Sequence, residues 1–432
     1  MEEALSEVPL LACLPFLIML LAIAALPLSA PRFWENNKNK LLVALVLSAP
    51  VVVYFAARRE TALIRETLIF DYLPFIVLLG ALYTIAGGIH LAGDIEATPR
   101  VNALFLGIGA VLASFIGTTG AAMLLIRPVL RTNQERRFKT HTVLFFIAIV
   151  ANCGGLLTPL GDPPLFMMYL RGAPFGWFFG FLSQWLFVNG LLLLVYFGVD
   201  AYYHGKEPAE SLQRDRAERR PLRIQGASNF AWLLGVIGAV AFLNEQYVPG
   251  TGSHSPLRFL REAAIVLMAA ASWLSTKKIV RHYNRFTWHS FHEVAYLFLG
   301  IFITMVPCIA YLQANAKTLG VRLPSQFYYA VGALSSFLDN TPAAVTFHSL
   351  ALGLGQSSGR LVAGIPEALL QAICLSSVFF GSMTYIGNGP NFMVKAIAED
   401  HHVRMPHFFG YLVKFSLLVL FPIFVLVQLL FI

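Results

Sequence analysis

Carboxylate, amide and hydroxyl side chains interrupt four otherwise apolar stretches of this chain. The most polar interruption is Thr158–Pro164, which contains Asp162 and lies inside an apolar run from Val143 to Leu170. A soluble helix would not hold three prolines, a glycine and an acid at its centre. A helix at membrane depth can be broken in this way where its backbone faces protein or a polar cavity. The freed carbonyl, hydroxyl and carboxylate oxygens suit a cation, whereas the N-termini of the half-helices suit an anion, so the pattern alone permits either ion.

The interrupted stretch has a counterpart in the second half of the chain. The segment Thr384–Met393 repeats the Thr, Gly, Pro, Phe and Met of Thr158–Met167 at a constant spacing of 226 residues. A second pair of segments, Ser114–Ala122 and Ser336–Ala344, aligns in the same order at a spacing of 222 residues. Paired Gly/Pro-interrupted hydrophobic segments in the two halves of a chain are typical of the binding sites of transporters.

Asp339 is the one acid in the aligned segments Ser114–Ala122 and Ser336–Ala344. The residue that aligns with it in the first segment is Gly117. An ionisable group at membrane depth is costly and is a functional candidate by default, so Asp339 is predicted to bind a metal cation or a proton. The alternative is that Asp339 caps the helix that begins at Thr341-Pro342, and both roles can coexist. For Asp162 the capping interpretation is the stronger one, because Asp-Pro-Pro is a helix-start signal, and direct ion contact is the alternative.

Neutral polar side chains at the same breaks are predicted either to line the ion or substrate site or to satisfy unwound backbone. They are Thr118, Thr119, Asn152, Thr158, Asn340, Thr341, Thr384, Asn388 and Asn391. Glycines are predicted to let the backbone turn at the breaks, at Gly117, Gly120, Gly161, Gly387 and Gly389.

Composition places the chain in a membrane. Of its 432 residues, 57% are hydrophobic and only 12% are charged, whereas soluble proteins are about a quarter charged. The net charge of +8 does not indicate nucleic-acid binding, because the basic residues concentrate between apolar spans. The four cysteines fall in apolar spans at unrelated spacings, which argues against disulfides and resident metals. No nucleophile elbow, phosphate loop or metal-ligand cluster suggests an enzyme, and no cofactor is predicted.

The apolar segments predict an all-α polytopic protein built as two repeats. The first repeat, residues 1–200, has spans near 9–30, 41–57, 70–90 and 175–199, a re-entrant hairpin near 101–130 and a broken helix near 140–170. A polar connector covers 201–225. The second repeat, residues 226–432, has spans near 228–248, 260–275, 290–312 and 406–432, a hairpin near 325–354 and a broken helix near 366–398.

Charge distribution predicts the orientation of these spans. With the acidic N-terminus outside, the inside loops hold 20 Lys and Arg residues and the outside loops hold 9, which fits the positive-inside rule. Both termini are then outside, the connector is inside, and the start of the chain is an anchor rather than a cleaved signal. Five crossings and one hairpin per half make the two repeats inverted relative to each other.

At these residues the chain resembles the ion transporter superfamily, in its arsenite-permease and NhaD-type sodium/proton antiporter branch. The resemblance rests on Gly120–Pro128, on Ala151–Gly155 with Gly161–Pro164, and on Asp339–Pro342. It implies inverted repeats, a scaffold that usually dimerises and a transport part that moves as an elevator. Relatives with this fold carry citrate and other carboxylates with sodium and show Ser-Asn-Thr at both tips. This chain has Gly117-Thr118-Thr119 and Asp339-Asn340-Thr341 instead, which weakens the carboxylate interpretation.

The sequence thus predicts a sodium/proton antiporter of a bacterial inner membrane, with Asp339 as the main carrier and Asp162 second. A desolvated carboxylate can hold either a proton or a sodium ion, so competition for one site can give antiport. The alternative is sodium- or proton-coupled transport of citrate or a related organic anion. A channel or a non-transporting receptor is a third class. The sequence does not support it, because it contains no voltage-sensor arginine ladder and no carbonyl filter motif.

Overall fold

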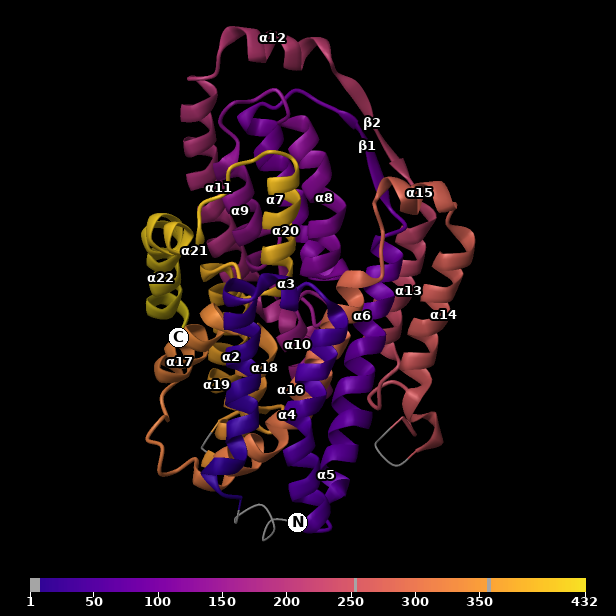
Figure 1. The fold of residues 1–432 in the computed structure, drawn as a ribbon, viewed down its shortest axis with the longest axis vertical. Coiled ribbons are helices and arrows are strands. Elements are labelled where there is room, and N and C mark those ends of the chain that lie inside the picture. The colour runs from indigo at the N-terminus through magenta and orange to yellow at the C-terminus, as the bar shows by residue number, and fades with distance from the viewer. Residues whose placement is uncertain (1–7, 252–254, 356–358) are drawn as a thin grey trace.

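The computed structural model describes residues 8–251, 255–355 and 359–432, and it is almost entirely helical (Figure 1). Within this part of the chain, seven helical stretches are long and apolar enough to cross a membrane. Many large apolar side chains on them face outward, including Val53 at 67%, Leu194 at 70% and Leu418 at 70% exposure. Such a surface would be a liability in water and is what hydrocarbon requires. The prediction of an all-α polytopic membrane protein is confirmed.

Helices of the first half end close to the predicted boundaries, and the predicted breaks are present. The third span is longer than predicted, since it begins at Thr61 and includes a π-helical segment. The elements are η1 Leu10–Cys13, α2 Leu14–Ser29, α3 Pro31–Trp34, α4 Asn37–Ala57, α5 Thr61–Glu66, η2 Thr67–Tyr72, α6 Leu73–Ala86, β1 His90–Asp94, α7 Pro99–Ile116, α8 Thr118–Thr132, α9 Thr140–Ile149, η3 Cys153–Leu156, α10 Pro163–Leu170, η4 Phe175–Phe181 and α11 Leu182–His204.

The connector and the second half follow the same pattern. The α7 arm of the first predicted hairpin is itself one of the seven stretches, whereas α13 and α19 are shorter apolar helices. The elements are α12 Ala209–Ala217, β2 Arg220–Gln225, α13 Ser228–Phe242, η5 Pro256–Phe259, α14 Leu260–Ser275, α15 Lys278–Tyr283, α16 His289–Asn315, α17 Pro324–Phe337, α18 Asn340–Leu354, β3 Leu361–Val362, β4 Ile365–Pro366, α19 Glu367–Phe380, η6 Gly381–Met383, α20 Gly389–Asp400, α21 Phe408–Tyr411, η7 Leu412–Leu420 and α22 Phe421–Phe431.

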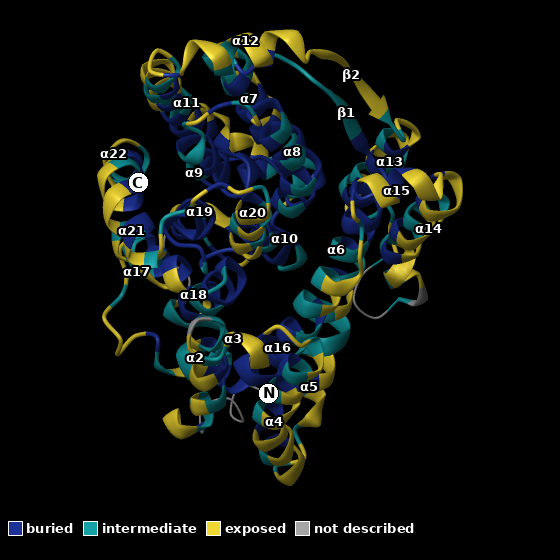
Figure 2. Cartoon of the chain, turned by 45° about the horizontal axis from the view of Figure 1, so that its top comes forward, coloured by how far each residue is buried: buried dark blue, intermediate teal, exposed yellow. Residues whose placement is uncertain are grey.

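The helices form two groups. One group contains α2, α4, α6, α13, α14 and α16, and the other contains α7–α11 and α17–α22. The most buried ribbon lies in the second group, in α9, α10 and α19, whereas α4 and α14 carry many exposed residues (Figure 2). The groups meet where α16 packs on α18 and where α6 packs on α8. The polar breaks therefore lie in the most enclosed part of the molecule.

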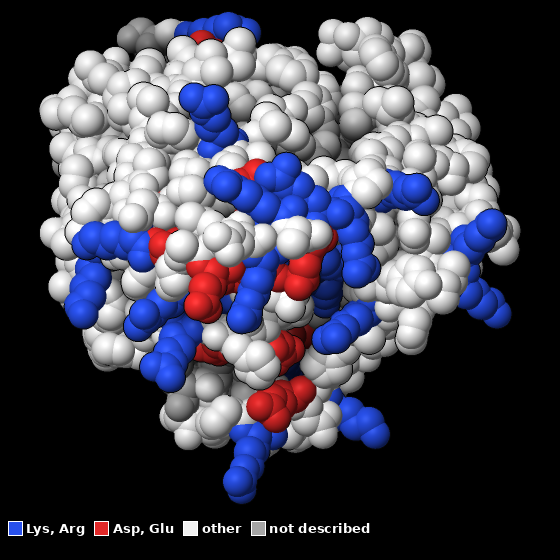
Figure 3. All heavy atoms as spheres, turned by 90° about the horizontal axis from the view of Figure 1, so that it is seen from above, with Lys and Arg blue, Asp and Glu red and all other residues white. Residues whose placement is uncertain are grey.

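A short ribbon joins the two chain segments that connect these groups. Strand β1 follows α6 and leads to α7, and it pairs antiparallel with β2, which leads to α13, so that His90 faces Gln225 and Asp94 faces Arg220. The segments are 130 residues apart in sequence, and the strands were not predicted. The ribbon and α12 lie at one end of the molecule (Figure 1), and Lys, Arg, Asp and Glu gather over that face (Figure 3).

The carboxylate of Asp94 in this ribbon predicts a pH-dependent stability. Its Oδ1 is buried without a hydrogen-bond partner. Burial, together with the nearby Glu135 and Asp215 carboxylates, raises the pKa of Asp94 from 3.8 to about 6. The folded state therefore bears the full cost of this charge above about pH 6, and the cost declines as the pH falls from about 6 to the ordinary pKa of 3.8.

We therefore expect Asp94→Asn to raise the thermal unfolding midpoint at about pH 8 and to raise it by a smaller amount at about pH 5. The measurement is a thermal unfolding scan in detergent at both pH values. Glu210→Gln, at an exposed position of α12, is the control and should change neither midpoint. An equal gain at both values of pH would contradict this assignment.

Candidate functional site

Four helices begin at one place inside the second group. Helices α8, α10, α18 and α20 start at the predicted breaks, directly after Gly117, Asp162, Asp339 and Asn388. Each N-terminus presents free backbone N–H groups and a partial positive charge. Two of these helices come from each half of the chain, so the site is assembled from both halves.

Asp162 lies at the centre of this assembly and is 1% exposed. Its Oδ1 accepts hydrogen bonds from Thr118 Oγ1 at 3.0 Å and from Asn388 Nδ2 at 3.1 Å. Its Oδ2 accepts one from Asn340 Nδ2 at 2.7 Å. These donors belong to the other three helix starts, so the carboxylate joins all four breaks. Within the described residues, no Lys or Arg forms an ion pair with it.

Of the two aspartates, Asp339 and not Asp162 caps its helix with its side chain. Asp162 occupies the N-cap position of α10, but its side chain makes no capping hydrogen bond, so the prediction that it is chiefly a cap is wrong. Asp339 does cap, because its Oδ1 accepts the backbone N–H of Thr341 at 3.0 Å. An Asp-Pro-Pro sequence signals a helix start, but Pro163 and Pro164 have no backbone N–H to be capped, and the carboxylate instead accepts hydrogen bonds from side chains across the fold.

Asparagines behind Asp162 form a continuous network. Asn388 Nδ2 also donates to Asn152 Oδ1 at 3.1 Å, and Asn152 Nδ2 donates to Asn391 Oδ1 at 2.7 Å. Asn391 Nδ2 then donates to the carbonyls of Gly381 and Thr384, at 2.8 and 2.9 Å. Asn152 and Asn391 thus hold unwound backbone and position Asn388, and they do not line the cavity described below.

The two threonines of the broken helices occupy equivalent places. Thr158 Oγ1 donates to the carbonyl of Ser114, and Thr384 Oγ1 donates to the carbonyl of Ser336. Each threonine oxygen also accepts a backbone N–H two residues further on, at 3.1 Å in both cases. Each broken helix is thereby fastened to the hairpin of its own half, so these threonines support the site rather than line it.

Two oxygen atoms at the start of α18 lack hydrogen-bond partners. Asn340 Oδ1 and Thr341 Oγ1 are buried, and neither has a hydrogen-bond partner. Unsatisfied buried oxygens are uncommon and point to a missing ligand or water. Carboxylate, amide and hydroxyl oxygens together are the ligand set of a hard cation. Among the described residues, no cluster of three His, Cys, Asp or Glu side chains could hold a resident metal.

The glycines of the broken helices are needed for close packing rather than for an unusual φ. A Cβ on Gly161 would lie 2.0 Å from the carbonyl oxygen of Gly155, and a Cβ on Gly387 would lie 2.6 Å from that of Gly381. Neither glycine has a positive φ, whereas Gly117 has φ +81°. Gly161 and Gly387 were predicted to let the backbone turn. The structure instead shows that each is in close contact with the backbone of another residue, where a side chain would not fit.

The other two glycines of the predicted set differ from each other. Gly120 packs against Ala86 of α6, with 3.3 Å to that methyl group from an added Cβ. Gly389 has open space where a Cβ would be, so nothing in its surroundings requires glycine there.

A cavity of about 620 Å³ adjoins this site, which is within the usual range for a small-molecule pocket. It lies between the two helix groups and is lined on one side by Asp162, Asp339, Thr118, Thr119 and Asn388, and on the other by residues of α2, α6 and α16. Four carboxylates and one lysine line it, namely Asp162, Glu293, Asp339, Asp400 and Lys395.

Sequence reasoning missed the charges on the α16 side of the cavity. Glu293 pairs at 2.7 Å with Lys40 of α4, which is only 3% exposed. Neither residue belongs to a motif or to a break; the packing of α4 on α16 brings them together, and Glu293 of this pair lines the cavity. Ser114 and Ser336, which anchor the broken helices, could have been found from the hairpin alignment.

Comparisons with known proteins agree with this architecture. A family model described as "Putative citrate transport" matches residues 5–432. The "Inner membrane protein YbiR" of Escherichia coli (strain K12) is 28% identical over 131 residues, which are 28% of this chain and 34% of YbiR. The aligned stretch thus spans about a third of that relative's length.

Proposed function

The chain belongs to the family described as "Putative citrate transport", and we propose that within this class of transporter it is a secondary active transporter that exchanges sodium for protons. Asp162 is the carboxylate that takes either ion, and the oxygens of Asp339, Asn340 and Thr341 at the second hairpin tip are the further ligands. This assignment moves the main carrier from Asp339 to Asp162. It needs no cofactor and no resident metal.

The observation that carries the proposal is the isolation of Asp162. A buried carboxylate without a basic partner is expensive unless a proton, a cation or strong hydrogen bonds compensate its charge. Three donors supply part of the compensation, and unpaired oxygens lie on the neighbouring tip residues. A sodium ion would use those oxygens, whereas a proton would remove the charge. One site that accepts either, but not both, couples their movement.

The arrangement of the helices supports an alternating-access mechanism of the elevator type. We propose that residues 1–200 and 226–432 are inverted repeats joined by the 201–225 connector. The matched contacts of Thr158 and Thr384, and of Gly161 and Gly387, support this division. The group that contains α8, α10, α18 and α20 would then move against α2, α6 and α16, across the cavity between them.

Transport of citrate or a related organic anion is the second candidate, which the family description and the size of the cavity favour. Against it stand the carboxylates of Asp162, Asp339 and Asp400 in the lining, which would repel a multivalent anion unless cations accompanied it, whereas the fourth carboxylate, Glu293, is paired with Lys40. Ion-dependent proton movement in everted vesicles, with sodium, lithium, potassium and citrate compared, separates the candidates. A signal with sodium alone supports antiport, and one that requires citrate supports the anion carrier.

Asp339 tests whether charge or capping matters at the second tip. Asn caps a helix about as well as Asp, so Asp339→Asn should keep the fold and the expression level. Because Asp339 lines the cavity beside Asp162, we expect weaker sodium affinity, by about tenfold, with transport still measurable. Sodium titration of proton movement in everted vesicles measures this. Complete loss of exchange would return Asp339 to the role of main carrier.

The orientation of the chain is also part of the proposal. We place the protein in a bacterial inner membrane with lipid around its apolar faces, as a homodimer with both termini outside. The first seven residues, on which the N-terminal part of this prediction rests, lie outside the described residues. The connector, with α12, is placed inside.

A cysteine at Ser211 tests this orientation. Ser211 lies on α12, at the end of the molecule where charged side chains gather (Figure 3). In a variant without the four native cysteines, Ser211→Cys should react with a membrane-impermeant maleimide only after the cells are permeabilised. Full labelling of intact cells would overturn the proposed topology.

A further inference from the structure

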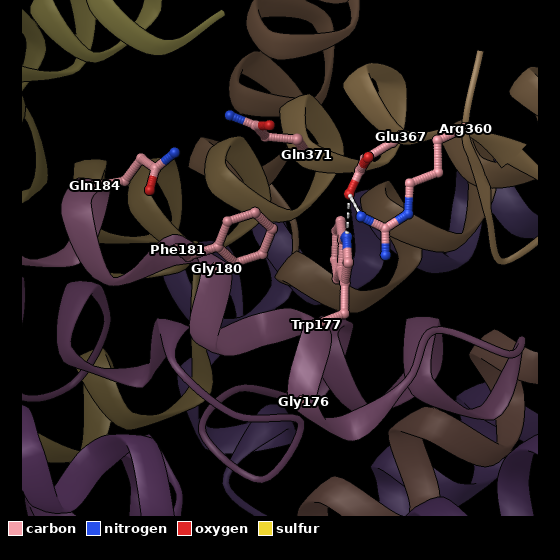
Figure 4. A pocket seen from close by; sticks show the side chains of 8 residues that line it. All are labelled: Gly176, Trp177, Gly180, Phe181, Gln184, Arg360, Glu367 and Gln371. Carbon is pink, nitrogen blue, oxygen red and sulfur yellow. Dashed lines mark hydrogen bonds and ion pairs between the residues drawn. The ribbon is translucent and has the colours of Figure 1, made fainter. Parts of the chain in front are cut away.

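A second cavity, of about 320 Å³, lies away from the aspartates and is unused by the proposed exchange. It is formed between η4, the start of α11 and the start of α19 (Figure 4). Aromatic, amide and charged side chains line it, from Trp177, Phe181, Gln184, Arg360, Glu367 and Gln371. In Figure 1, α19 lies in the lower half of the molecule, away from α12.

One cation and one anion meet in this pocket. Arg360 Nη1 lies 3.4 Å from Glu367 Oε1, and the same oxygen accepts a hydrogen bond from Trp177 Nε1 at 2.7 Å. The ion pair is open to solvent, since the side chains of Arg360 and Glu367 are 70% and 33% exposed. An exposed pair of this kind contributes little to stability. Both charges remain accessible to a ligand that carries the complementary pair.

The space in the pocket depends on two glycines. A Cβ added to Gly176 or Gly180 would meet no atom within 4 Å, and neither residue has a positive φ. Both positions could therefore carry a side chain without strain, and a large one would project into open space. The absence of side chains at these positions keeps the cavity open.

Exposed apolar side chains lie on the elements that form the pocket. Phe179, Leu182 and Leu186 are 45%, 49% and 55% exposed and follow one another at helical spacing. On the other side, Gln371 donates to the carbonyl of Phe431 at the end of α22, where Leu429 and Leu430 are also exposed. A polar pocket that opens beside apolar, outward-facing helices fits a molecule with a charged head and hydrocarbon chains.

We propose that this pocket binds the headgroup of a zwitterionic phospholipid of the phosphatidylethanolamine type. The phosphate takes the guanidinium of Arg360, and the ammonium takes the carboxylate of Glu367 beside the Trp177 ring. The ligand thereby replaces one ion pair by two. The acyl chains lie along the exposed Leu429 and Leu430 at the end of α22, to which Gln371 of the pocket is bonded through the carbonyl of Phe431. The proposal does not depend on which ion the transporter carries.

Binding can be measured on the full chain, purified in detergent and stripped of lipid. Native mass spectrometry would follow titration with dihexanoyl phosphatidylethanolamine, dihexanoyl phosphatidylglycerol, O-phosphoethanolamine and inorganic phosphate. We expect saturable binding of the phosphatidylethanolamine, with Arg360→Gln and Gly180→Leu each weakening it by at least about tenfold. Gly198→Leu, at an exposed position of α11 that also has open space, is the matched control and should bind as the unchanged protein does.

The ligands distinguish the possible sources of a phosphate. Binding of the phosphatidylethanolamine alone supports a lipid site. Equal affinity for O-phosphoethanolamine would mean a site for a soluble phosphorylated amine, and equal affinity for the phosphatidylglycerol would mean charge attraction only. Each of these results would overturn the proposal. So would unchanged binding by Gly180→Leu, because that variant fills the cavity.

Discussion

Asp162→Asn should abolish sodium/proton exchange while the protein still inserts and purifies as a folded species. The carboxylate accepts from Thr118 and Asn388 through one oxygen and from Asn340 through the other. An asparagine has only one acceptor oxygen, so its amide group would face at least one of these donors. An unsatisfied buried donor costs about 1–3 kcal/mol, and the titratable proton is lost as well. Both effects act on the bound ion directly.

The measurement is sodium-dependent proton movement in everted vesicles, with the unfolding midpoint recorded in detergent beside it. Asp71→Asn is the matched control, because Asp71 is a partly buried acid whose partner is Arg171, at 3.3 Å. We expect that control to keep exchange. If Asp162→Asn exchanges at the original rate and pH dependence, Asp162 is not the carrier and the organic-anion function becomes the better one.

The sequence predicted the helix breaks because their signals are local. Glycine, proline and a polar side chain within an apolar run report on backbone conformation at that point. For the same reason the helices around Gly117, Asp162, Asp339 and Asn388 begin within a residue or two of the predicted breaks. The sequence also predicted a polytopic membrane protein correctly, because this class depends on hydrophobic composition over long stretches of the chain.

The relative importance of the two aspartates could not be predicted in this way. Asp339 and Asp162 both precede a helix and a proline, and local rules make each a cap. What separates them is contact with residues distant in sequence, since Asn340 and Asn388 lie 178 and 226 residues from Asp162. The β1–β2 ribbon and the Lys40–Glu293 pair were missed for the same reason. Contacts between distant segments leave no periodic or compositional signal in a single sequence.

Gly161→Ala should reduce transport nearly as severely as the loss of the carboxylate, although it changes no polar group. The added methyl would lie 2.0 Å from the carbonyl oxygen of Gly155, a distance at which the backbone must move. The carbonyl of Gly161 accepts the N–H of Thr118 at 2.8 Å, and the next residue is Asp162 itself. Displacement of this segment therefore moves both the hairpin tip and the carboxylate. Overpacking of a buried site typically costs about 1–3 kcal/mol, here concentrated at the ion site.

The equivalent change, Gly387→Ala, should have the same effect, because its methyl would lie 2.6 Å from the carbonyls of Gly381 and Ser335. Gly190→Ala in α11 is the control, since that position has open space and should keep full transport. Sodium-dependent proton movement and the unfolding midpoint would be measured for all three variants. Normal transport by both Gly161→Ala and Gly387→Ala would mean that these backbone contacts do not hold the site. Loss of transport in only one of these two variants would mean that the two broken helices contribute unequally. That result would contradict the proposal that the two halves of the chain have matched roles.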